Sequence, residues 1–330
     1  MPANLPPQYL EAEKKFRQAH TNQEKLEALE EMLSIIPKHK GTEKLQAEIK
    51  QRISKLRKQA TREKKSQAKT HHDPYFIERA GAAQIAIVGP PNSGKSTFLA
   101  TLTRARPEIA DFPFSTYYPT PGMMEYQDIQ IQLIDFPPIA DENIEGNFTN
   151  ALRRADAILL IADATSKRLL EDIEIVEKAL GKSKISFLPR PLPSLSWTFL
   201  PLIIMLNKVE TPSSQENLAL CQELWQDKTE VIGISLKTKN KETIERIKEK
   251  IFQLAGIIRI YSKPPGLPPD LSRPFILKKG ETVKDLAEQI HRDIAQEIKG
   301  ARVWGSGKFD GQLVSVDHPL EDKDIVEIHT

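Results

Sequence analysis

The chain has 330 residues, of which 39% are hydrophobic and 28% charged, and its formal net charge is +2 at pH 7. This length and near-neutral charge are typical of a globular protein with two or three domains. Its one cysteine, Cys221, excludes an intrachain disulfide and fits a reducing cytosol. The first residues lack the apolar core of a secretory signal, and the run FLPLIIML from Phe199 is too short to span a bilayer. We therefore expect a cytoplasmic protein without a membrane partner.

Residues 7–60 contain two segments with the apolar spacing of amphipathic helices. Pro37 and Gly41 separate them, so we expect a helical hairpin and a linker within residues 1–75. Between Lys38 and Thr70 there are twelve Lys or Arg residues against three Glu. This charge indicates either a solvated helix face or an arm that binds RNA or another polyanion. The apolar positions are Leu26, Leu29, Met32, Leu33 and Ile36, then Leu45, Ile49, Ile53 and Leu56.

Short apolar runs alternate with helix-compatible sequence through residues 76–257. The runs are AQIAIVG from Ala83, AILLIAD from Ala157, PLIIMLN from Pro201 and EVIGIS from Glu230. Such alternation predicts an α/β domain whose mostly parallel sheet is covered by helices on both faces. The stretch GMMEYQDIQIQLID, which begins at Gly122, instead predicts a hairpin with one half-exposed strand. Ligands of such sheets bind beyond the carboxyl ends of the strands.

Residues 258–330, which follow a helix ending near Gly256, have a different character. A Pro- and Gly-rich crossing, KPPGLPPD, precedes strand-like PFILKKG and a helix over ETVKDLAEQIHRDIAQEIKG. Shorter strand-like pieces follow at ARVWG, GQLVSV and DIVEIH. This order predicts a small mixed α+β domain of ββαββ type.

The segment GPPNSGKST satisfies the phosphate-loop pattern G-x-x-x-x-G-K-[ST] between an apolar strand and a helical segment. Its backbone N–H groups and the helix N-terminus would surround phosphate oxygens. Lys95 would reach the β and γ phosphates, and Ser96 would bind Mg²⁺. The predicted phosphate-binding residues are Gly89, Pro90, Pro91, Asn92, Ser93, Gly94, Lys95, Ser96 and Thr97.

Two more predicted strands end in polar residues. Asp135 ends the strand expected beside the loop, where it either holds Mg²⁺ through water or caps the strand. In LNKVE, the pattern Asn207-Lys208-x-Glu210 suits guanine, because one carboxylate accepts hydrogen bonds from the ring N–H and the exocyclic amine. Adenine presents an acceptor at that ring position and would be repelled.

These residues resemble the Obg-related GTPases, most closely their developmentally regulated GTP-binding branch, over about residues 38–330. ADFPFSTYYPTPG, from Ala110, is similar to the switch I segment of that family. The resemblance places Phe114 and Ser115 in the switch and the magnesium-binding threonine at Thr116.

Two other segments carry the same resemblance. SLK, which comprises Ser235, Leu236 and Lys237, resembles the loop whose backbone contacts guanine. The tail, with LKKGETVKDLAEQIH and ARVWG, resembles a ubiquitin-like TGS domain. The resemblance implies a slow, Mg²⁺-dependent GTPase that binds GTP and GDP and contacts ribosomes or ribosomal RNA through the basic arm and the TGS domain. Asn92 matches the family position that binds K⁺ in potassium-stimulated members, or it stabilises the loop.

Switch II departs from the family pattern Asp-x-Pro-Gly, since the chain reads Asp135-Phe136-Pro137-Pro138. The family's glycine donates its amide to the γ-phosphate, but Pro138 has no N–H. Losing this hydrogen-bond donor would weaken γ-phosphate binding by about 1.5 to 3 kcal/mol. Ile139 or Ala140 could supply a substitute amide. Ile139 also stands where small GTPases place a glutamine that orients water, so no catalytic base can be named.

Glu210 is a second departure, because the family has Asp there. A related branch that has Glu at this position prefers ATP. This chain retains the lysine of the family pattern, Lys208, which favours GTP. Leu236 replaces a more usual alanine and is a small change. We therefore keep three hypotheses: a slow GTPase that acts on ribosomes, a nucleotide-binding scaffold with little hydrolysis, and an ATP-using protein. Whether a partner protein activates hydrolysis stays open.

Overall fold

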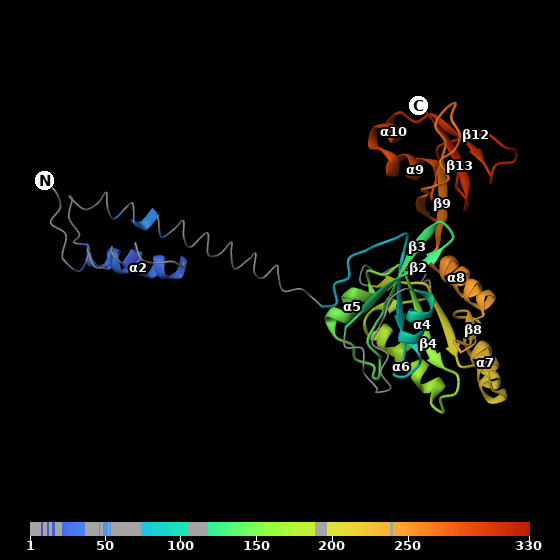
Figure 1. Ribbon diagram of the computed structural model, residues 1–330, viewed down its shortest axis with the longest axis horizontal. Helices are drawn as coiled ribbons and strands as arrows, with labels where there is room; N and C mark the ends of the chain where they lie inside the picture. The colour runs from blue at the N-terminus through green and yellow to red at the C-terminus, as the bar shows by residue number, and fades with distance from the viewer. Residues whose placement is uncertain are drawn as a thin grey trace. The chain divides into compact units, whose positions relative to one another are not determined.

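The computed structural model describes residues 22–36, 74–103, 118–188, 197–237 and 240–330, together with single residues at 8, 12, 15, 16, 46, 49–51 and 53. The chain divides into two compact units, residues 1–73 and 74–330 (Figure 1). Of the predicted site residues, Phe114, Ser115 and Thr116 lie outside the described residues, as does most of the basic segment 38–70.

The first unit contains helix α2 (Asn22–Ile35). Leu29 and Met32 on this helix are buried in one cluster with Ile49 and Ile53 of the second predicted helical segment. Residues 49–51 and 53 are helical. The described apolar residues of the two predicted segments therefore pack against each other.

The second unit is built on a six-stranded sheet in the order β2-β3-β1-β4-β7-β8 (Figure 1). All neighbours are parallel except β2 and β3, which form the expected hairpin. Strand β2 is buried only at alternate positions over most of its length. The strands are β1 (Gln84–Val88), β2 (Thr120–Tyr126), β3 (Ile129–Asp135), β4 (Ala157–Asp163), β7 (Leu202–Asn207) and β8 (Val231–Ile234). The predicted parallel α/β sheet is confirmed.

Helices cover both faces of this sheet because successive side chains of a strand point to opposite sides. Ile85 and Ile87 of β1 pack with the helices of one face, and Ala86 and Val88 pack with those of the other. Helices α4 (Lys95–Leu102) and α8 (Lys241–Ala255) cover the first face. Helices α5 (Gly146–Leu152), α6 (Leu169–Lys182) and α7 (Pro212–Trp225) cover the second. A short pair, β5 (Ile185–Ser186) and β6 (Thr198–Phe199), lies outside the main sheet.

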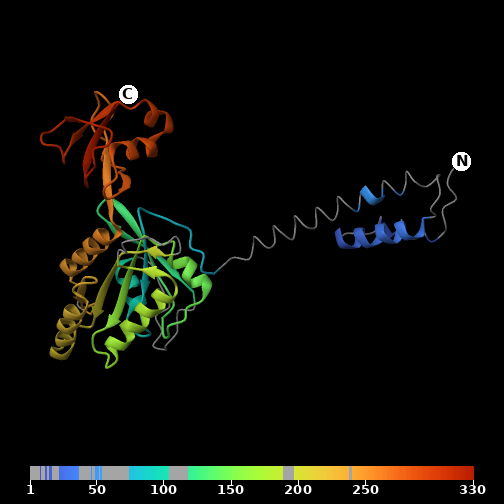
Figure 2. The same cartoon turned by 180° about the vertical axis from the view of Figure 1, so that it is seen from behind.

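A second, five-stranded sheet follows α8, in the order β10-β9-β13-β11-β12. Figure 2 shows this C-terminal part of the chain, in orange and red, from behind. Its strands are β9 (Ile257–Ser262), β10 (Phe275–Lys278), β11 (Gly300–Trp304), β12 (Gln312–Val314) and β13 (Asp324–His329). Helices α9 (Val283–Ile290) and α10 (Arg292–Glu297) occupy the stretch predicted as one helix. The chain breaks this helix at His291, whose backbone is extended and whose Nδ1 accepts a hydrogen bond from Asp293 N.

Arg259 of β9 joins the small sheet to the large one. The residue is 1% exposed, and its guanidinium donates to Gln127 and Asp128 in the β2–β3 turn and twice to Asp322. Tyr261 donates to the other oxygen of Asp128. Both carboxylate oxygens of Asp128 and both of Asp322 accept hydrogen bonds, so these contacts fix the β2–β3 turn against β9. Figure 1 shows the hairpin reaching this strand.

Candidate nucleotide-binding site

The phosphate loop connects β1 to α4 and adopts a conformation that requires glycine. Gly89 has a φ of 153°, and a Cβ there would come within 2.1 Å of the Ile161 carbonyl oxygen. Gly94 precedes α4 with a φ of 95°, and its Cβ would lie 2.5 Å from Asn207 Nδ2. The loop therefore passes close to the ends of β4 and β7. It leads directly into the N-terminus of α4, where backbone N–H groups are available to an anion.

Lys95, the first residue of α4, folds back over the loop. Its Nζ donates to the carbonyl oxygens of Gly89 at 3.1 Å and Pro90 at 2.9 Å. Burial lowers the pKa of Lys95 from 10.5 to about 8, although Asp135 acts in the opposite direction. The cation therefore lies at the phosphate loop without a full counter-charge, which is a site that a polyphosphate would stabilise.

Asp135 ends β3, next to β1 in the sheet, and is completely buried. Ser96 Oγ donates to Asp135 Oδ2 at 2.6 Å, whereas Asp135 Oδ1 has no hydrogen-bond partner. Burial raises the pKa of Asp135 despite the Ser96 hydrogen bond and the Lys95 charge. A buried carboxylate oxygen without a donor, beside a hydroxyl, is an oxygen-only set of the kind that Mg²⁺ prefers. The residues present thus fit the expected metal.

The segment after Asp135 is bonded to the phosphate loop. Phe136 N donates to Ile87 O, and Ile139 N donates to Gly89 O at 3.1 Å. The intervening Pro138 cannot donate, so the next parallel-sheet hydrogen bond comes from Ile139 instead. The Ile139 side chain is buried in the core. Its amide is therefore already bonded to the phosphate loop, and the expectation that it replaces the missing switch glycine stays a prediction.

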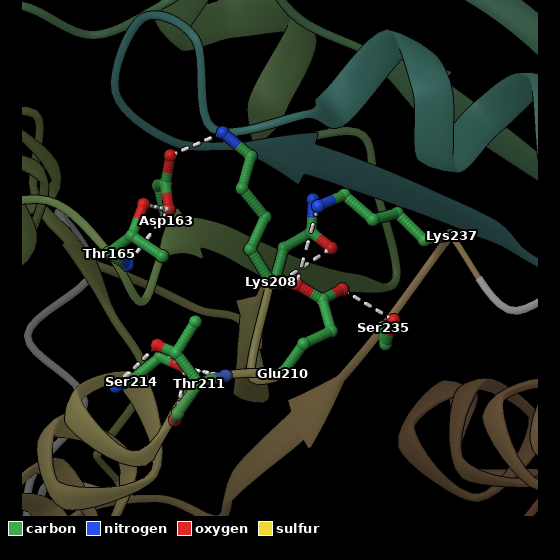
Figure 3. Close-up of polar contacts among 9 residues, drawn as sticks. Asp163, Thr165, Lys208, Glu210, Thr211, Ser214, Ser235 and Lys237 are labelled. Carbon is green, nitrogen blue, oxygen red and sulfur yellow. Dashed lines mark hydrogen bonds and ion pairs between the residues drawn. The ribbon is translucent and has the colours of Figure 1, made fainter.

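Asn207, Lys208 and Glu210 follow β7 at the same edge of the sheet. Asn207 is buried and its Nδ2 donates to Ser93 O of the phosphate loop at 3.3 Å. Glu210 Oε1 accepts a hydrogen bond from Ser235 Oγ at 2.5 Å, and its Oε2 lies 3.8 Å from Lys237 Nζ (Figure 3). The structure therefore brings the predicted base-binding residues together. Leu236 packs against the core formed by α4 and α8.

A capping box fixes the end of this segment. Thr211 Oγ1 accepts from Ser214 N, Ser214 Oγ accepts from Thr211 N, and Pro212 occupies the first turn of α7. These contacts satisfy free N–H groups at the helix start and set the direction of the chain after Glu210.

Asp163, the last residue of β4, lies in the site although the sequence motifs do not include it. Its carboxylate forms an ion pair with Lys208 Nζ (Figure 3). In the sheet register, Asp163 lies beside Asn207. The available signal was the acidic residue at the end of AILLIAD, since the carboxyl ends of parallel strands share one edge.

Comparisons with known proteins agree with this geometry. A family model described as "50S ribosome-binding GTPase" matches residues 84–189, and one described as "TGS domain" matches residues 258–330. The helices of the described residues include none that is long and apolar enough to cross a membrane.

The chain is similar to curated proteins along nearly all of its length. An uncharacterized GTP-binding protein of Methanocaldococcus jannaschii is 30% identical over 369 residues, with 93% of this chain and 92% of that protein covered. Human developmentally-regulated GTP-binding protein 2 is 27% identical, with 92% and 98% covered. Ribosome-interacting GTPase 1 of Saccharomyces cerevisiae is 26% identical, with 93% and 99% covered.

Solved structures show the same fold. A GTP binding protein from Pyrococcus horikoshii OT3 aligns with a TM-score of 0.50 and 20% identity, covering 75% of this chain and 99% of that one. The Schizosaccharomyces pombe YchF GTPase aligns with a TM-score of 0.52 and 13% identity, covering 77% and 99%. Together with the phosphate loop, the predicted base-binding residues and the C-terminal TGS domain, these relationships show that the chain belongs to the developmentally regulated GTP-binding family of P-loop GTPases.

Proposed function

We propose that this GTP-binding protein depends on Mg²⁺ and hydrolyses GTP slowly. The observation that carries the proposal is the arrangement of Lys95, Ser96 and Asp135 at the N-terminus of α4, with one buried Asp135 oxygen left without a donor. Ser96 and Asp135, with Thr116 outside the described residues, would hold the metal. The metal would neutralise charge on the β and γ phosphates when bound.

The base preference is the second part of the proposal. Glu210 would accept hydrogen bonds from guanine, and its carboxylate is already held by Ser235 and faces Lys237. The backbones of Ser235, Leu236 and Lys237 would border the base. An ATP preference would require a donor toward the adenine ring nitrogen, which the Glu210 carboxylate cannot supply.

The alternative, a scaffold that binds nucleotide with little hydrolysis, is favoured by one contact. Ile139 N is bonded to Gly89 O and Pro138 lacks an N–H, so neither is available to a γ-phosphate. Ala140 is exposed, and its amide has no acceptor within residues 74–103, 118–188 and 197–330 as far as these are described. Its amide is the substitute donor that a nucleotide switch would use.

The proposal also includes a K⁺ site at Asn92 and a ribosomal partner. Asn92 has an exposed side chain and a φ of 59°, so its amide oxygen could reach a K⁺ ion beside the phosphate loop. The name of the yeast relative supports a ribosomal partner, as do the TGS domain and the basic charge of residues 38–70. We accordingly infer a cytoplasmic protein with a basic hairpin at 1–75, a GTPase domain at 76–257 and a TGS domain at 258–330.

Nucleotide titration tests the proposal. We expect the purified chain to bind fluorescent GDP and GTP more tightly with Mg²⁺ than without, to bind ATP weakly, and to turn GTP over slowly, faster in K⁺ than in Na⁺. Lys95→Met should weaken GDP and GTP binding at least about a hundredfold, given the strength of charge-assisted contacts. Lys178→Met, which removes an exposed lysine of α6, is the matched control. Unchanged GDP and GTP affinity in Lys95→Met would refute the proposed site. If the wild type binds GTP and GDP equally and does not turn GTP over, the nucleotide-binding scaffold is the remaining hypothesis.

A further inference from the structure

Lys208 is held at its backbone and at the far end of its side chain. Its backbone is left-handed, with a φ of 67°, and its N–H donates to Asn207 Oδ1 at 2.9 Å. Its Nζ is paired with Asp163 across the edge of the sheet. Figure 3 shows the aliphatic stem running from the end of β7 toward the end of β4. The stem thus has one defined direction, on the side away from the Ser235 contact of Glu210.

The Asp163 carboxylate is itself fixed before it meets Lys208. Asp163 Oδ1 accepts from Thr165 N at 2.9 Å and from Thr165 Oγ1 at 2.7 Å. The following residue, Ala164, donates its amide to Asn207 O, and Ala164 O accepts from Asn217 Nδ2 of α7. The end of β4 is therefore tied to both β7 and α7. Its free oxygen, Oδ2, is the one that receives the ammonium group.

Electrostatics agree with this arrangement. Burial raises the pKa of Asp163, but hydrogen bonds from Lys208 and Thr165 outweigh it and hold the pKa below its usual value. The Asp163 carboxylate is therefore charged at neutral pH. The side chains are partly exposed, at 39% for Lys208 and 18% for Asp163, so the ion pair alone would be a modest source of stability. The position of this ion pair indicates a role other than stabilising the fold.

We propose that Asp163 is a positioning residue for the nucleotide base. By holding the Lys208 ammonium group, it keeps the lysine stem extended along one side of the base site before the nucleotide arrives. A free lysine side chain would lose its rotamer freedom on binding, and a side chain ordered in advance does not. The inference rests on the proposed guanine-nucleotide binding and assigns Asp163 to the base rather than to the phosphates or the metal.

A double-mutant cycle tests the proposal through Lys208. The full-length wild type, Asp163→Asn, Lys208→Met and the double variant are titrated with fluorescent GDP and GTP. We expect Asp163→Asn to weaken both nucleotides equally, by roughly five- to tenfold, with and without Mg²⁺. We expect the double variant to bind no more weakly than Lys208→Met alone, because Asp163 would then have no side chain to position. Asn retains the oxygen that accepts from Thr165, so the β4 end should keep its shape.

Glu171→Gln is the matched control, since it removes one exposed carboxylate whose partner, Arg168, lies outside the site. It should leave GDP affinity unchanged. Inosine diphosphate, which lacks the exocyclic amine of guanine, gives a second readout. Asp163→Asn should weaken it by the same factor as GDP, because the lysine stem contacts the ring and not the amine.

Three results would overturn the inference: unchanged GDP affinity in Asp163→Asn, additive losses in the double variant, or a loss for GTP that exceeds the loss for GDP. A wild type that binds no guanine nucleotide would instead refute the proposed function. If Asp163→Asn lowers the melting temperature, the cycle is repeated with Thr165→Val in place of Asp163→Asn. Thr165→Val removes one hydrogen-bond donor to the Asp163 carboxylate. Additive losses in that cycle would also overturn the inference.

Discussion

Nucleotide binding in alkaline solution should load a proton onto Lys95. Burial lowers the Lys95 pKa from 10.5 to about 8 in the empty site. At pH 8.5 about three quarters of empty sites would then hold a neutral lysine. A bound diphosphate favours the charged form, so the pKa rises again and binding takes up about 0.75 proton. The full difference between a Lys95 pKa of 10.5 and one of about 8 corresponds to about 3 kcal/mol in the free energy of protonation.

The sign of the pH dependence follows from these proton numbers. Between pH 8 and the pKa in the complex, the complex binds more protons at Lys95 than the empty protein does. GDP affinity therefore falls as pH rises through this window, by up to about tenfold per pH unit. Below pH 7 both states carry the proton, and Lys95 contributes no pH dependence.

Isothermal titration calorimetry measures the proton directly. GDP is titrated at pH 8.5 in two buffers of different ionisation enthalpy, and the difference in apparent enthalpy gives the protons taken up. Leaving out Mg²⁺ removes any proton released from Asp135, and the diphosphate is already ionised at this pH. Lys95→Met should bind more weakly and take up none. If the wild type takes up no proton and its affinity is constant from pH 7.5 to 9.5, then Lys95 is charged in the empty site and the burial argument is wrong.

Three further changes test other parts of the structure. Asp135→Asn should abolish the gain in GTP affinity that Mg²⁺ gives, measured by titration with and without the metal, and a retained gain would exclude Asp135 as its ligand. Pro138→Gly should raise the preference for GTP over GDP by about ten- to hundredfold, because it restores an amide donor, and an unchanged ratio would argue against a lost sensor. Arg259→Ala should lower the free energy of unfolding by about 3 to 5 kcal/mol in urea, since it leaves Asp128 without its cation. The control Arg168→Ala, at an exposed arginine, should leave the free energy of unfolding unchanged within error.

Local patterns were sufficient for the phosphate loop and for Asp135. Gly89, Lys95 and Asp135 are recognised from spacing and from the strand or helix beside them, and each takes the place that a parallel sheet gives it. The pairing of Asp163 with Lys208 was not recognisable in this way, because the two residues are 45 positions apart and their contact depends on strand order. Arg259 is a stronger case, since 132 residues separate it from Gln127.

Secondary structure was missed where two elements meet without a polar break. Strand β9 begins at Ile257, one residue after the left-handed Gly256 ends α8, so its apolar residues continue the pattern of the helix. The opposite error occurred at His291, where helical spacing continues although the backbone turns extended. At that break the His291 side chain accepts a hydrogen bond from Asp293 N, a local contact that hydrophobic periodicity does not report.

The contacts of the Gly89 carbonyl oxygen bear on how this chain could sense a γ-phosphate. This oxygen accepts from both Lys95 Nζ and Ile139 N. A carbonyl oxygen has two lone pairs, so Lys95 can turn toward a phosphate while Ile139 stays bonded. If Lys95 binds the phosphates as we propose, its movement therefore does not release the start of the predicted switch II. Phe136 N is used by the sheet and the two prolines have no N–H, so Ala140 carries the first amide after Asp135 that has no acceptor within the described part of the chain. Any movement of switch II toward a γ-phosphate must begin there, two residues later than the family glycine.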